Sequence, residues 1–246
     1  MIPWKLLGIA KTSRNGSELR LYQRDIEFSI KADNQELMNS QVHGSEDALA
    51  KLACERFAHR PEVRALIGGL GLGYTLRAAL DELNQDAEVV VAEIVPDVVQ
   101  WNRDFLGHLA GSPLEDRRVN VQVTDVAQII VSSKGNYNAI MLDVDNGPQA
   151  MTQEGNGWIY GFDGLESLFR ALRPEGVLSV WSTDPDPAFT KRLLKTEFKA
   201  EEVKARARGG KKGRGHCFVR VAPAVRSLPP ASSRCRRSHR RSWRSG

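Results

Sequence analysis

The chain has 246 residues, and 41% of them are hydrophobic, so it can bury one sizeable core. Its net charge of +5 comes from the tail 223–246, which holds seven arginines and no acidic residue; without those seven charges the remainder carries −2. Because a nucleic-acid-binding protein spreads basic charge over a folded face, we expect no nucleic-acid partner outside the tail. No run of about 18 apolar residues is present, so we expect no membrane-spanning helix.

The first 45 residues are expected to form a small amino-terminal β-hairpin region. Apolar and polar residues alternate over 26–30, which is the period of a half-buried strand. A turn is predicted at Asp33, after which the chain returns. Residues 46–58 then have the apolar spacing of an amphipathic helix, and Pro61 prevents its continuation.

From residue 63 onward, short apolar runs alternate with helical segments, which indicates a doubly wound α/β fold. We expect a mostly parallel, seven-stranded, methyltransferase-like (Rossmann-like) sheet with an antiparallel last strand. This catalytic domain spans 46–222, and the Arg/Ser/Pro-rich tail 223–246 is expected to be disordered. The predicted strands are 63–67, 88–92, 118–123, 138–142, 176–181, 201–208 and 216–221. The predicted helices after residue 63 are 72–83, 97–106, 126–132, 163–172 and 187–197.

A glycine-rich loop between the first of these strands and the next helix is the strongest local signal. Gly69, Gly71 and Gly73 allow a sharp turn and a close approach of the backbone to a ligand. A dinucleotide site would have its third glycine at position 74, which is Tyr74 here. The spacing therefore favours a nucleoside without phosphate, an adenosyl sulfonium compound; the alternative is a glycine turn with no ligand.

Acidic residues follow the next two strands. Glu93 ends its strand about 20 residues beyond the glycine loop, where an acid can accept both ribose hydroxyls. The alternative for Glu93 is an exposed carboxylate at the end of a strand. Asp125 either accepts a hydrogen bond from the adenine amino group or caps the helix that starts at 126, and the two roles are compatible.

The fourth strand ends at Asp143, where a reacting group would lie in an open parallel sheet. A carboxylate there can orient a cationic amine and take its proton; the alternative is a turn or capping residue. Asp145 has the same two interpretations. In the long loop that follows, Trp158 and Tyr160 either form a wall of the acceptor site or cover the core.

The three cysteines and five histidines show no metal-ligand spacing, so we expect no metal and no covalent nucleophile. Few, widely spaced cysteines also favour a reducing, cytoplasmic location. The amino end lacks a signal-peptide cleavage site, and no secretory signal is expected. The tail 223–246 is either an arm for nucleic acid or an anionic surface, or an extension without a role.

Together these residues resemble the spermidine synthase (polyamine aminopropyltransferase) family over about residues 18–221. The resemblance implies a decarboxylated S-adenosylmethionine donor and a small-molecule amine acceptor such as putrescine. It also implies that Asp143 is the catalytic aspartate, that Glu93 binds the ribose and that Asp125 lies beside the adenine. A homodimer paired through the amino-terminal region is a further implication.

The chain departs from the family pattern at two places. The usual Asp-x-x-Asp-Pro run is replaced by a run in which Asp145 follows Asp143 after one residue. The family's Tyr-His-Glu segment is absent, and only the acidic character of Glu46 and Asp47 survives there. We therefore keep two alternatives: methyl transfer from S-adenosylmethionine itself, and a non-catalytic binding protein. Glu46 is our candidate for contacting the acceptor.

Overall fold

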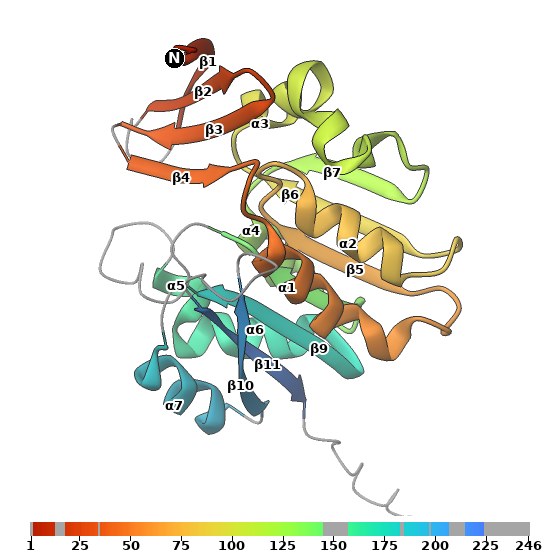
Figure 1. Ribbon diagram of the computed structural model, residues 1–246. Coiled ribbons are helices and arrows are strands. Elements are labelled where there is room, and N and C mark those ends of the chain that lie inside the picture. Colours follow the sequence, from red (N-terminus) through yellow and green to blue (C-terminus); the bar gives the residue numbers. More distant parts are fainter. Residues whose placement is uncertain are drawn as a thin grey trace, which may run out of the picture.

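The structure is a computed structural model that describes residues 2–12, 18–33, 35–144, 157–182, 185–196, 198–206 and, for the backbone, the strand 215–223. A small antiparallel sheet lies beside a larger sheet that has helices on both faces (Figure 1). The α/β class and the parallel core of the large sheet, both expected from the sequence, are confirmed.

The small sheet has four strands in the order β1-β2-β3-β4, where a single hairpin was predicted. The predicted alternating strand is β3, and its return is β4. No separate strand was predicted at β1, whose interior residues 6–10 are all apolar or glycine and do not alternate, or at β2, where Leu19 and Leu21 do alternate with charged neighbours. The β2–β3 turn at Asp25 has no glycine or proline to mark it. The bounds are β1 Lys5–Lys11, β2 Glu18–Arg24, β3 Glu27–Ala32 and β4 Gln35–Asn39.

The large sheet has the strand order β10-β11-β9-β8-β5-β6-β7. The neighbours from β9 to β7 are parallel, whereas β11 runs antiparallel to both β9 and β10. The chain therefore reverses its winding direction between β5 and β8, and loops from both strands meet there. The bounds are β5 Arg64–Gly68, β6 Glu88–Glu93, β7 Val119–Val123, β8 Tyr137–Leu142, β9 Leu172–Ser182, β10 Phe198–Arg206 and β11 Gly215–Pro223.

Helices bury both faces of the large sheet. On one face, α1, α2 and α3 share a core with the small sheet; on the other, α4, α5, α6 and α7 form a second core (Figure 1). Gly8 of β1 packs so closely on Trp101 of α3 that a Cβ there would lie 2.5 Å from the indole nitrogen. The helices are α1 Gly44–Cys54, α2 Tyr74–Glu82, α3 Pro96–Trp101, α4 Val126–Ser132, α5 Gly157–Tyr160, α6 Phe162–Ala171 and α7 Pro187–Lys195.

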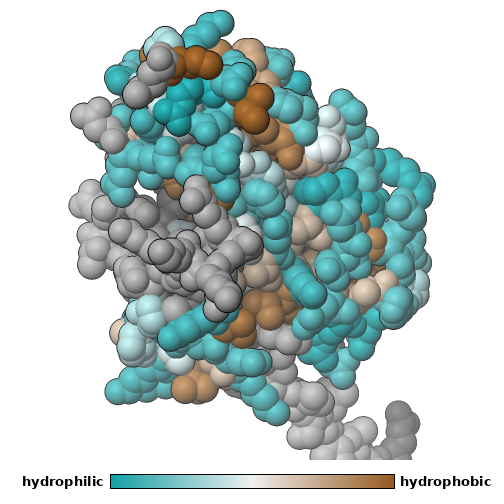
Figure 2. Space-filling model, in the orientation of Figure 1, coloured by the Kyte–Doolittle hydropathy of each residue, from teal (hydrophilic) through white to brown (hydrophobic). Residues whose placement is uncertain are grey.

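The visible surface is mainly hydrophilic, with apolar atoms scattered over it (Figure 2). Exposed apolar side chains of the small sheet and its turns include Leu6, Ile9 and Ile26. Across the described chain, no helix combines the length and apolar character needed to cross a membrane.

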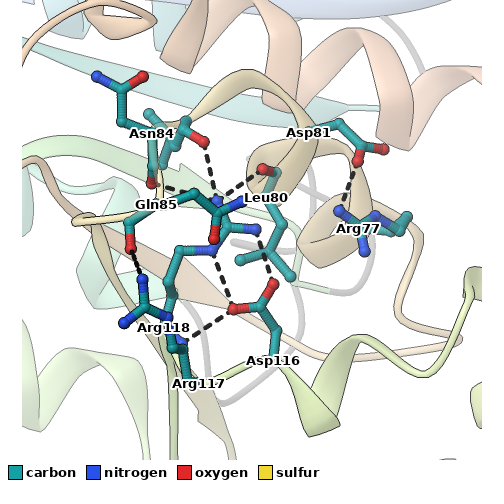
Figure 3. Close-up of polar contacts among 9 residues, drawn as sticks. Arg77, Leu80, Asp81, Asn84, Gln85, Asp116, Arg117 and Arg118 are labelled. Carbon is teal, nitrogen blue, oxygen red and sulfur yellow. Dashed lines mark hydrogen bonds and ion pairs between the residues drawn. The ribbon is translucent and has the colours of Figure 1, made fainter.

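A buried arginine secures the carboxyl end of α2 against the start of β7 (Figure 3). The Arg118 side chain is only 3% exposed. Its Nη1 donates to the carbonyl oxygens of Leu80, Leu83 and Asn84 at 2.9, 2.8 and 3.2 Å. Its Nε and Nη2 donate to the two carboxylate oxygens of Asp116 at 2.9 and 2.7 Å. The helix end is thus closed by a charged side chain that is itself paired.

This pairing makes stability depend on pH. Hydrogen bonds from the Arg118 guanidinium lower the pKa of Asp116 from 3.8 to about 2. A carboxylate with a lowered folded-state pKa stabilises the fold above its unfolded pKa, and the contribution is lost as the pH falls through the folded value. We expect Asp116→Asn to reduce the free energy of unfolding by about 1–3 kcal/mol at neutral pH in urea denaturation. The deficit should shrink between about pH 4 and about pH 2.

A matched control is Asp81→Asn, which removes an exposed carboxylate paired with Arg77. Its effect should stay below about 0.5 kcal/mol because exposed ion pairs contribute little. An Asp116→Asn deficit that is the same at acidic and neutral pH would show that the ion pair is not its source.

Candidate active site

The three glycines turn the chain from β5 into α2 in left-handed conformations. The φ angles are 91° at Gly69, 52° at Gly71 and 85° at Gly73. A Cβ on Gly69 would lie 2.3 Å from the backbone oxygen of Asp143, so only glycine fits there. Met38 of β4 lies against Gly71, and a Cβ there would be 3.0 Å from its sulfur. The loop is therefore held between β8 and the small sheet.

Glu93, at the end of β6, lies against this loop. Its Oε2 accepts a hydrogen bond from the backbone N–H of Leu70 at 2.9 Å, and its Oε1 accepts one from Val95 at 2.9 Å. The residue is 7% exposed, so the alternative of an exposed strand-end carboxylate is wrong. A carboxylate accepts hydrogen bonds only, at about four positions, so hydroxyl donors such as those of a ribose suit its chemistry. That role remains a prediction.

Asp125 caps α4. Its side chain accepts a hydrogen bond from the backbone N–H of Ala127 at 2.9 Å. The preceding Thr124 donates its N–H to the backbone oxygen of Glu93 at 3.0 Å, which places the ends of β6 and β7 side by side. The capping role is thus observed, and the adenine-side role remains a prediction.

Asp143 lies on the other side of the glycine loop. Its N–H donates to the backbone oxygen of Gly68 at 2.9 Å, which continues the pairing of β8 with β5. Its Oδ2 accepts a hydrogen bond from the hydroxyl of Thr75, in the first turn of α2, at 2.5 Å. The structure therefore places Glu93 and Asp143 on strands that flank the loop, on opposite sides of β5. Such a pair can contact opposite parts of one bound nucleoside donor.

The start of α1 brings Glu46 close to the same region. Burial raises the pKa of Glu46, and the Ser45 hydroxyl donates a hydrogen bond to its carboxylate. The ring of His43 stacks on Tyr74, the residue after the last loop glycine, with centroids 4.2 Å apart. Burial and the nearby charges of Glu46 and Asp47 raise the pKa of Tyr74. Two acids and two rings thus gather beside the loop.

Three residues of this region have no predicted role from the sequence: His43, Tyr74 and Thr75. At Tyr74 the sequence pattern indicates only that a glycine is absent. Thr75 carries a sequence signal, because a hydroxyl two residues after the last loop glycine falls in the first turn of the helix. His43 carries none, since its stacking depends on how α1 packs on α2.

The candidate acceptor residues have different outcomes. Asp145 lies outside the described residues. Trp158 is 41% exposed on α5, and its contact with an acceptor remains a prediction. Tyr160 is fully buried, and its ring packs edge-on against Phe189 of α7 with centroids 5.6 Å apart. Tyr160 therefore covers the core, which corrects its assignment to the acceptor site.

Possible metal ligands do not cluster in the described part of the chain, and the cysteine described there, Cys54, is buried. There, no group of three His, Cys, Asp or Glu side chains could hold a metal ion. Burial raises the pKa of the Cys54 thiol to about 12, which keeps it protonated and unreactive at neutral pH. The sulfur of Cys54 is thus a core atom.

The segment that contains these residues matches a known protein family. The profile of the spermine/spermidine synthase domain matches residues 46–202. The chain belongs to the spermine/spermidine synthase family. The match includes the glycine loop, Glu93, Asp125, Asp143 and Glu46, and it excludes the small sheet.

Curated relatives in the family are polyamine aminopropyltransferases. The protein of Bacillus mycoides is 32% identical over 145 residues, which is 58% of this chain and 49% of the relative. That of Bacillus subtilis is 31% identical over 140 residues, 56% of this chain and 47% of the relative. The chain thus spans about half the length of the curated relatives that it matches.

Solved structures show the same fold at low sequence identity. The spermidine synthase of Thermotoga maritima superposes with a TM-score of 0.71 and 16% identity, covering 90% of this chain and 74% of that one. A probable spermidine synthase from Corynebacterium glutamicum superposes with a TM-score of 0.60 and 15% identity. The superposition covers 93% of this chain and 84% of that one. Because this coverage exceeds the profile match, the small sheet is part of the likeness in fold.

Proposed function

We propose that this chain transfers an aminopropyl group from decarboxylated S-adenosylmethionine to a polyamine-type amine. The carrying observation is the arrangement around the glycine loop, where Glu93 bonds the Leu70 N–H and Asp143 bonds the Gly68 oxygen. The names of the relatives support the same reaction: they are polyamine aminopropyltransferases, and one structural neighbour is a spermidine synthase in complex with the transition-state analogue AdoDATO.

In the proposed reaction, Glu93 and the glycine loop hold the nucleoside part of the donor, with Asp125 on the adenine side. Asp143 orients the protonated amine and accepts its proton, so that the nitrogen lone pair becomes available. The nitrogen attacks the aminopropyl carbon next to the sulfonium, a C–N bond forms and the C–S bond breaks. The bonding electrons return to sulfur, and methylthioadenosine leaves. Holding both reactants in line supplies most of the rate enhancement.

The acceptor end of the site is assigned to Glu46, Asp145 and Trp158. Burial raises the pKa of Glu46, and a cationic amine placed beside this carboxylate would favour its ionised form. A diamine has two cationic ends, so the carboxylates of Asp143 and Glu46 together would match its charge. A homodimer and a cytoplasmic location also belong to this proposal, by analogy with the family.

Methyl transfer from S-adenosylmethionine is the second candidate. It is favoured by the departure from the Asp-x-x-Asp-Pro pattern at Asp143, because a methyltransferase does not need that second acid. The two donors differ in one group: S-adenosylmethionine carries a carboxylate that requires a cationic or N–H-rich partner, whereas the decarboxylated donor carries only an amine.

Titration calorimetry with the two donors, in one buffer at one salt concentration, separates the candidates. We expect decarboxylated S-adenosylmethionine to bind at least about tenfold more tightly, about 1.4 kcal/mol. Incubation with a panel of diamines should then release methylthioadenosine. Tighter binding of S-adenosylmethionine would favour methyl transfer. Binding of neither donor would contradict a nucleoside site at the glycine loop.

A further inference from the structure

A hydroxyl group from the helix that follows the glycine loop contacts the proposed base directly. Thr75 Oγ1 donates to Asp143 Oδ2 at 2.5 Å, and the two residues are 68 positions apart in the chain. Thr75 is only 2% exposed. A buried hydroxyl that lacks a partner is costly, so its orientation toward Asp143 is a defined feature of the fold.

The glycine loop is what brings Thr75 to this place. Gly73 caps α2 in a left-handed conformation, with φ 85° and ψ 4°, so the helix begins directly at Tyr74. Thr75 then falls in the first turn, at the positive end of the helix dipole, where a carboxylate is stabilised. The same turn that shapes the donor site therefore aims a hydroxyl at Asp143.

The usual alternative for a helical threonine is a bond to a carbonyl three or four residues earlier. For Thr75 these are the carbonyls of Leu72 and Gly71, and that of Gly71 accepts a hydrogen bond from Asn102 Nδ2 at 2.8 Å. Asn102 Nδ2 also donates to the Val98 oxygen at 2.9 Å, which ties the loop to α3. The hydroxyl of Thr75 instead donates across the site to Asp143.

The backbone of Asp143 is already fixed by β5, through its N–H bond to Gly68 and the close approach of its carbonyl to Gly69. A fixed backbone does not by itself set the side-chain torsions of an aspartate. The hydrogen bond from the Thr75 hydroxyl constrains the orientation of one carboxylate oxygen. The side chain is then oriented before the amine arrives.

We propose that Thr75 is a positioning residue for Asp143, holding its carboxylate in the orientation that accepts the proton of the amine. This inference rests on the proposed function, in which Asp143 contacts the acceptor. Misplacing a reacting group by about 1 Å can cost about a hundredfold in rate. The effect of losing the hydroxyl should therefore appear in kcat rather than in donor binding.

The test compares Thr75→Val, which keeps the shape and removes the hydroxyl, with Thr75→Ser, which keeps the hydroxyl. We expect Thr75→Val to lower kcat at least about tenfold while the Kd of decarboxylated S-adenosylmethionine changes less than about twofold. Thr75→Ser should keep kcat within about threefold of wild type. The inference is overturned if Thr75→Val turns over like wild type, or if both variants lose the same activity.

A second measurement needs no turnover and so separates this inference from the proposed function. Urea denaturation of wild type, Thr75→Val, Asp143→Ala and the double variant forms a double-mutant cycle. A direct bond predicts that the two substitutions are non-additive, by about a factor of three or more in the folding equilibrium. Additive effects would contradict the contact even in an active enzyme. Coupling in a protein without transferase activity would confirm the contact but overturn both the proposed function and the positioning role that rests on it.

Discussion

Replacing Asp143 by asparagine should lower kcat for aminopropyl transfer by about a hundredfold to ten-thousandfold, the usual contribution of a general base. Asparagine has the same shape and still accepts the Thr75 hydrogen bond, but it cannot take a proton from the amine. The Kd of decarboxylated S-adenosylmethionine should change by less than about threefold, because the nucleoside is held by the loop and Glu93. Release of methylthioadenosine measures the rate, and calorimetry measures the binding.

The matched control for this variant is Asp81→Asn, which removes a carboxylate from the exposed side of α2. It leaves Thr75 and the glycine loop in place and should keep kcat within about twofold of wild type. Turnover of Asp143→Asn at the wild-type rate would remove Asp143 from the reaction and, with it, the role proposed for Thr75.

Alanine at Gly69 should be the most damaging single substitution in the donor site. A Cβ there would lie 2.3 Å from the backbone oxygen of Asp143, and φ is 91°, a conformation that is strained for alanine. Both the loop and the end of β8 must move to accept it. We expect the free energy of unfolding to fall by about 3–5 kcal/mol, from strain and overlap together, and donor affinity to fall at least about a hundredfold.

Gly135→Ala separates the two causes. Gly135 also has a positive φ, 61°, but a Cβ there would meet no atom within 4 Å. Gly135→Ala should lower the free energy of unfolding by only about 1–2 kcal/mol, which is the strain of an alanine in a left-handed conformation. Its donor affinity should equal that of wild type. Equal losses at the two positions would mean that overlap with the Asp143 oxygen has no effect. Urea denaturation and calorimetry of both variants decide this.

The sequence predicted the strand–helix alternation well because buried strands and amphipathic helices have local periodicities. The expected helix over 126–132, for example, is α4 with the same bounds. The small sheet was predicted only in part. β3 has a clear alternation and a turn signal after it, whereas the interior of β1 is apolar without alternation and the turn after β2 has no glycine or proline.

The candidate site shows the same division. The need for glycine at Gly69 and the strand-end positions of Glu93 and Asp143 follow from local patterns and from the geometry of parallel sheets. The position of Tyr160 does not follow from a local pattern, because an aromatic residue near a loop can either cover the core or line a site. In the folded chain it packs against Phe189 of α7 and covers the core.

The α/β class, the position of the glycine loop and the acids that end the strands are evident from the amino-acid sequence alone, because each depends on residues near one another in the chain. The bond of Thr75 to Asp143 and the stacking of His43 on Tyr74 become evident only in the folded chain. The physical reason is that β5 lies between β6 and β8, an order set by packing across the whole sheet. No local pattern contains that order, and the contact of Thr75 with Asp143 depends on it, while the stacking of His43 on Tyr74 depends on the packing of α1 on α2.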